Sequence, residues 1–203
     1  TFQASMNFPI NEAKNRYPML TVNSNLWGVK STIPEYLFKK EKNKQKFKFT
    51  TGFTGKDQVQ IGVEFGKKGS AILELDQSKK TTYLRKGAIS ISSKKAVLPR
   101  NNVLYIDGSI KEITPQKWIR ALELDKGESK QTFFVKPIIF NLDELKILTV
   151  KESDNKYKAV SNPRNFPAFE GIVKKFYFNK DFIGRVDLKV SQKKYGLQLD
   201  ELI

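Results

Sequence analysis

Hydrophobic residues recur at every second position in several parts of the chain. In the segment Lys46–Phe53, Phe47, Phe49 and Phe53 fall on one side of the alternation, and Lys46 and Lys48 fall on the other. A period of two places successive side chains on opposite faces of an extended strand. This pattern predicts a β-strand with one buried face and one polar face.

The same alternation appears in four other segments, namely Val59–Phe65, Ile89–Ile91, Ile172–Phe178 and Arg185–Val190. Short polar or glycine-containing stretches separate the early strands, as at 54–57 and 66–69, and such stretches are typical of tight turns. Strands at this spacing predict a mainly β fold, either a small antiparallel barrel or a sandwich.

Helix signals are few. The segment 31–38 has Pro34 in its first turn and a lysine-rich end, which favours a short helix. Thr114–Trp118 could begin a second helix with Thr114 as its cap, although the following residues also fit strand alternation. Asn141–Leu145 is a candidate for one helical turn. We therefore expect one or two short helices.

The length of the chain fits one large domain or two small ones. The segment 151–168 contains Pro163 and Pro167 and reads as a long loop. The strands after it are too few to build a separate domain. We therefore expect a single elaborated β-domain over residues 1–203, with a long loop near 151–168.

The charge of the chain points to a polyanionic partner. Lysine and arginine number 37 against 21 acidic residues, for a formal net charge of +16. DNA, RNA and an anionic membrane surface all attract such a protein. No apolar run reaches the length of a membrane span, so we expect no membrane partner. An AT-rich coding sequence would also raise the lysine content, so lysine richness alone does not decide the function.

The chain contains no cysteine and no histidine. Thiolate metal sites, cysteine nucleophiles, histidine metal sites and histidine general bases are thereby excluded. We expect a binding protein without cofactor, metal or catalytic activity. The weaker alternative is a metal-dependent nuclease that uses Glu64 with Lys67, or Asp143 and Glu144 with Lys146.

Basic residues repeatedly lie beside aromatic residues in this sequence. Lysine and arginine attract phosphates, and aromatic rings stack on bases. Lysine greatly outnumbers arginine, which favours tracking of the backbone over reading of base edges. The candidate nucleic-acid-binding residues are Trp27, Lys44, Lys46, Lys48, Tyr83, Arg85, Lys117, Trp118, Arg120, Lys174, Lys175 and Tyr177.

The alternating strands, the lysine-aromatic clusters and the missing histidine and cysteine resemble the single-stranded DNA-binding proteins of phages and large DNA viruses. Those proteins are typically elaborated OB-fold barrels. The resemblance implies sequence-independent coating of single-stranded DNA in replication, recombination or repair, inside the cytoplasm or nucleus of a host cell. It also implies replication proteins as further partners and leaves a homo-oligomer open. The alternatives are a β-rich virion or assembly protein with a basic surface, and an RNA-binding protein.

Overall fold

A computed structural model of the chain describes residues 2–8, 17–31, 38–78, 82–114, 137–148, 167–194 and 196–203. Eleven β-strands lie within these residues. They are β1 (Phe2–Asn7), β2 (Met19–Ser24), β3 (Phe47–Gly55), β4 (Gln58–Phe65), β5 (Gly69–Asp76), β6 (Tyr83–Ile91), β7 (Leu104–Ile113), β8 (Ile138–Ile147), β9 (Phe169–Phe178), β10 (Asp181–Lys193) and β11 (Gly196–Leu202).

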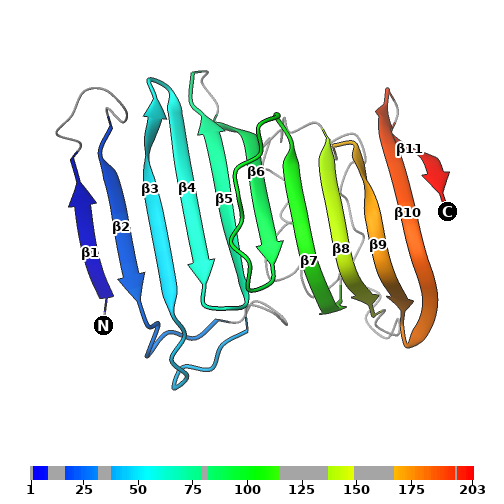
Figure 1. The fold of residues 1–203 in the computed structure, drawn as a ribbon, viewed down its shortest axis with the longest axis horizontal. Helices are drawn as coiled ribbons and strands as arrows, with labels where there is room; N and C mark the ends of the chain where they lie inside the picture. The colour runs from blue at the N-terminus through cyan, green and yellow to red at the C-terminus, as the bar shows by residue number, and fades with distance from the viewer. Residues whose placement is uncertain are drawn as a thin grey trace, which may run out of the picture.

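All eleven strands belong to one sheet, and their order in the sheet is their order in the chain (Figure 1). The mainly β prediction is therefore confirmed. The sheet is open, because β1 and β11 form its two edges and no described strand joins them. A barrel or a sandwich, including the OB-fold, stays an unconfirmed prediction.

The expectation of purely antiparallel pairing is wrong for the middle of the sheet. The pairs β6–β7, β7–β8 and β8–β9 are parallel, and the other neighbours are antiparallel. A parallel pair needs a connection of about a dozen residues or more, because the chain must return to the same end of the sheet. The connections 92–103, 114–137 and 148–168 have that length, whereas 56–57 and 66–68 are hairpin turns. Side-chain alternation carries no information about strand direction.

The predicted helical turn at Asn141–Leu145 is also wrong, since these residues lie inside β8. The two predicted helix starts fall mostly on 32–37 and 115–118, outside the described residues, as does 151–166 of the predicted long loop. No helix in the described part of the chain has the length and apolarity needed to cross a membrane. The single-domain prediction stays a prediction.

Strand register separates a mainly apolar face from a face of mixed polarity. Directly paired residues point to the same side of a sheet. One row on what we call the back face runs through Val22, Phe49, Val63, Ala71, Ile89, Ile106, Phe140 and Gly171. The neighbouring row on the front face runs through Asn23, Lys48, Glu64, Ser70, Ser90, Asp107, Asn141, Ile172 and Asp187.

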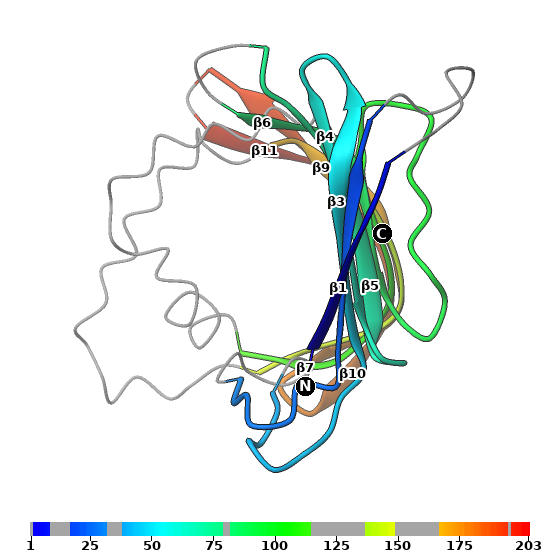
Figure 2. The ribbon, with the colours of Figure 1, turned by 90° about the vertical axis from the view of Figure 1, so that its left-hand side faces the viewer.

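The connection 92–103, called the crossover below, runs over the front face between β6 and β7. Figure 2 shows the strands as a single curved layer, with this connection on one side of it. Ser70 links the crossover to the front face of β5. Its hydroxyl accepts a hydrogen bond from the Ala96 amide (2.7 Å) and donates one to the Lys94 carbonyl (3.3 Å). The crossover is therefore fixed against the polar face.

The most buried apolar side chains of the back face cluster in the second half of the sheet. Leu142, Val173 and Val190 are at most 8% exposed. Their strands approach closely at Gly171, where an added Cβ would lie 2.0 Å from the Phe140 carbonyl oxygen. A glycine is required there because any side chain would collide with the backbone of β8.

Truncation of Leu142 tests this core. Leu142 is 5% exposed, whereas Leu199 on β11 is 55% exposed. We expect Leu142→Ala to lower the free energy of unfolding by about 2–5 kcal/mol through lost burial and an unfilled cavity. Leu199→Ala should change it by less than about 0.5 kcal/mol. Urea denaturation measures both, and equal losses would contradict the assignment of the core.

Candidate nucleic-acid interface

The connection between β2 and β3 is organised by backbone hydrogen bonds that draw its two halves together. The Gln45 amide donates to the Asn25 carbonyl (2.7 Å), and the Gly28 amide donates to the Glu41 carbonyl (3.1 Å). The Trp27 amide donates to the Asn25 side chain (3.0 Å). Gly28 has a φ of +81°, which a glycine adopts without strain. These contacts hold Trp27 beside residues 41–45.

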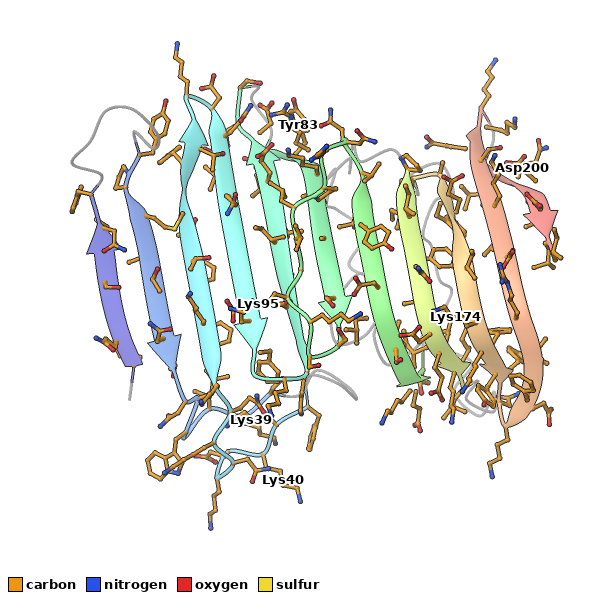
Figure 3. The ribbon with its side chains drawn as sticks, viewed as in Figure 1. Lys39, Lys40, Tyr83, Lys95, Lys174 and Asp200 are labelled. Atoms are coloured by element: carbon orange, nitrogen blue, oxygen red, sulfur yellow. The ribbon has the colours of Figure 1, made fainter. Side chains whose placement is uncertain are left out.

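Lys39 stabilises the β2–β3 connection from inside. Its side chain is buried, with 4% of the residue exposed. Its ammonium donates to the carbonyl oxygens of Val29 (2.5 Å), Lys40 (3.1 Å) and Glu41 (3.5 Å). Three oxygen acceptors offset the cost of removing the charge from water. Figure 3 shows Lys39 and Lys40 at the end of the sheet where β2 stops and β3 begins.

A cleft of about 790 Å³ lies between this connection and the β4–β5 turn. Five lysines line it, and we call it the lysine cleft; they are Lys44, Lys46, Lys48, Lys67 and Lys68. A smaller hollow of about 100 Å³ shares Lys48 and Glu64 with it and adds Lys95 beside the crossover. The two spaces therefore adjoin each other at Lys48 and Glu64.

Little acidic charge opposes these lysines. Glu64 pairs with Lys95, with 3.1 Å between the carboxylate oxygen and the ammonium. Lys68 donates to the Phe38 carbonyl (3.4 Å) and lies 5.7 Å from the centre of the Phe65 ring. Among the described residues, no carboxylate lies within 4.0 Å of the ammonium groups of Lys44, Lys46, Lys48 or Lys67. The cleft therefore presents net positive charge.

The structure brings several predicted residues together here. Lys44, Lys46 and Lys48 all line the lysine cleft. Lys44 and Lys46 are exposed, and Lys48 is half-buried on the front face. Trp27 is 60% exposed on the adjoining connection, so its ring is accessible. The three lysines therefore line one cleft, and Trp27 is exposed on the connection that borders it.

Tyr83 and Arg85 lie elsewhere, at the start of β6. Figure 3 places Tyr83 at the end of the sheet opposite Lys39 and Lys40. The Tyr83 hydroxyl donates to Asp76 (2.8 Å), and Arg85 pairs with Glu74 (3.2 Å). Hydrogen bonds from Ser78, then from Tyr83, hold the pKa of Asp76 below its ordinary value. Asp76 and Glu74 therefore partly neutralise the positive charge at this end of the sheet.

Lys174, Lys175 and Tyr177 lie on β9, six strand spacings of about 4.8 Å from β3, or roughly 29 Å as measured along the curved sheet. Lys174 pairs with Asp143 at 2.9 Å, and this hydrogen bond and charge lower the pKa of Asp143. Lys175 is exposed. These residues form a second basic area, separate from the lysine cleft.

Tyr177, a predicted nucleic-acid-binding residue, is less exposed than the phenylalanine that follows it. Phe178 is 44% exposed, while Tyr177 is half-buried. The Lys146 ammonium lies 4.6 Å from the centre of the Tyr177 ring, and the Phe182 ring centre lies 5.1 Å from it. The Tyr177 ring therefore already has two neighbours where a base was expected to stack.

Three further predicted residues, Lys117, Trp118 and Arg120, lie outside the described residues. Sequence reasoning did not select Lys67 and Lys68, which line the lysine cleft, or Lys95, which lines the adjoining hollow. The turn containing Lys67 and Lys68 was recognised, and the pairing of Phe47 with Phe65 brings that turn beside the start of β3. Counting residue pairs along the β3–β4 hairpin from its turn would have placed Lys67 and Lys68 beside the start of β3. Lys95 depends on the path of the crossover, which no local pattern specifies.

The alternative of a metal-dependent nuclease finds less support among the described residues. Glu64 pairs with Lys95, Asp143 with Lys174, and Glu144 with Lys146. The described part of the chain holds no group of three acidic side chains able to bind a metal ion. A hollow of about 450 Å³ on the front of β7–β11 is lined by Glu170, Asp187 and Glu201 with Lys189, so its charge does not favour phosphate.

Comparison with known proteins finds no matching family model, curated protein or solved structure. The lysine cleft must therefore be interpreted from its own residues.

Replacement of Lys39 tests whether its ammonium organises this surface. We expect Lys39→Met to leave three carbonyl oxygens without their donor and to open the connection around 39–45. Limited trypsin digestion should then cut at Lys40, Lys42 and Lys44 several times faster. The control is Lys40→Met, an exposed neighbour, and the two variants are compared at Lys42 and Lys44 because the control lacks the site at residue 40. An unchanged cleavage rate in Lys39→Met would show that the ammonium is dispensable.

Proposed function

We propose that this protein binds single-stranded DNA without sequence preference, through the lysine cleft and Trp27. The observation that carries the proposal is a cleft with five lysines and one glutamate, in which four of the lysines form no ion pair with a described acid, next to a connection with an exposed tryptophan. Phosphates would bind the ammonium groups and release counterions, and a base would stack on the indole. Binding without chemistry would serve the coating of exposed strands in replication, recombination or repair.

Two features favour a single strand over a duplex. Trp27 presents a flat ring, and only an unpaired base has both faces free for stacking. The cleft offers lysines and no arginine, so it has no fork-shaped donor for guanine edges in a major groove. The proposal rests on this cleft and does not require a closed OB-fold barrel.

RNA has the same phosphates and bases, so it is a second ligand for the same cleft. Fluorescence anisotropy with dT30, rU30 and a 30-base-pair duplex, each over a range of salt concentrations, separates these partners. Tighter binding of dT30 than of the other two supports the proposal. Equal or tighter binding of the duplex would overturn it, and tighter binding of rU30 would reassign the cleft to RNA.

Removing cleft lysines tests the phosphate contacts. We expect the triple variant Lys44→Gln, Lys46→Gln and Lys67→Gln to reduce the slope of log affinity against log salt by about 2, from about 0.7 per phosphate contact on a single strand. Affinity for dT30 at low salt should fall at least tenfold. The measurement is the same anisotropy titration.

The matched control removes three exposed lysines far from the cleft, through Lys56→Gln, Lys189→Gln and Lys193→Gln. It loses the same net charge. If affinity and slope change equally in both triple variants, only overall charge attracts the ligand, and the cleft is not the site.

Replacing Trp27 tests stacking separately from charge. We expect Trp27→Ala to weaken dT30 binding roughly 5- to 100-fold, because a stacked base contributes about 1–3 kcal/mol, while the salt slope stays the same. Trp27→Phe keeps a ring and should recover most of the affinity. Weakening by Trp27→Phe as severe as by Trp27→Ala would argue against stacking.

A further inference from the structure

The edge strand β1 lacks the features that normally prevent edge pairing. All six residues of Phe2–Asn7 are exposed, and none is charged in a chain that is 29% charged. The strand contains no proline. Its six pairs with β2 run from Phe2–Ser24 to Asn7–Met19 without a shift in register. A regular, uncharged edge leaves one row of backbone donors and acceptors available to another strand.

The opposite edge, β11, is protected. Its pairing with β10 shifts in register between Lys189 and Val190, so the strand carries an irregularity. Asp200 and Glu201 add negative charge at that place. A bulge and edge charges are two ways in which proteins block strand addition. The two edges therefore differ in their capacity to accept a partner.

We propose that β1 pairs antiparallel with β1 of a second copy, about a two-fold axis that is perpendicular to the sheet and passes midway between the two Ala4 residues. In this register Phe2 lies opposite Met6 of the partner subunit, and Gln3 lies opposite Ser5 of the partner subunit. Phe2, Ala4 and Met6 share the back face through their pairing with Ser24, Val22 and Leu20. The apolar face of one sheet therefore continues into the apolar face of the other.

This register follows from the alternation of backbone groups along the strand, because only every second residue of an edge strand points its N–H and C=O outward. A shift by one residue would place Phe2 opposite Asn7 of the partner subunit, so that a residue with outward backbone groups would face one whose groups point back to β2. A shift by two residues that centres the pairing on Gln3 loses two of the five pairs. A shift that centres it on Ser5 keeps five pairs but leaves Phe2 without a partner inside the strand Phe2–Asn7, so less apolar surface is matched. Because β11 is protected, the pairing of β1 uses the open edge of each copy, and association stops at a dimer.

The chain without any ligand provides the test. Sedimentation velocity over a concentration series should show a reversible monomer–dimer equilibrium. The double variant Gln3→Lys with Ser5→Lys places like charges opposite each other on the front face, and should weaken dimerisation roughly tenfold or more. The control, Gln198→Lys with Leu199→Lys on β11, adds the same charge and should dimerise normally.

A cysteine pair supplies a second readout that does not depend on those variants. The chain has no cysteine, so Ala4→Cys introduces the only thiol. Across the two-fold axis the Cα atoms would lie about 4.5–5.5 Å apart, within reach of a disulfide. Mild oxidation should produce a covalent dimer from Ala4→Cys and little from Leu199→Cys.

Three results would overturn the proposal. A monomer at every concentration would refute it, and so would crosslinking of Leu199→Cys without crosslinking of Ala4→Cys. Species that keep growing with concentration would indicate head-to-tail pairing of β1 with β11 instead of a closed dimer.

Discussion

Strand register is the constraint on which the rest of the structure depends. Along the central row of the back face, apolar residues lie opposite apolar residues of the neighbouring strand, from Val22 through Phe49 and Val63 to Phe140. A slip of one residue at any junction would send every following apolar side chain to the polar face. The position of each lysine on the front face is fixed by the same pairing that positions the core.

Alternation in the sequence predicted five of the strands but not their arrangement, and it missed β8, where a helical turn was expected at Asn141–Leu145. Alternation predicted Phe47, Phe49 and Phe53 on one face because side-chain period is a local property of the backbone. It could not predict that β6 and β7 run parallel, since direction depends on how the crossover returns. The same limit applies to the site. Lys44, Lys46 and Lys48 were found as a stripe, whereas Lys95 reaches them only through the tertiary path of its segment.

The lysine cleft lies at one end of the sheet because two connections between strands meet there. The β2–β3 connection and the β4–β5 turn leave the sheet at the same end and carry most of the unopposed lysines. Buried Lys39 contributes differently, because its ammonium donates hydrogen bonds to carbonyl oxygens inside the connection. A single residue type thus has two roles, of which one maintains the shape of the surface and the other supplies its charge.

The agreement between strand order and chain order has a consequence for how the protein is made. No strand needs a partner that is synthesised far from it, so the sheet can grow strand by strand from β1 as the chain leaves the ribosome. The hairpins from β3 to β6 close short turns and can form early, while the three parallel pairs must wait for longer connections. The residues that line the lysine cleft all precede residue 69. The charged surface can therefore be complete while the second half of the protein is still being translated.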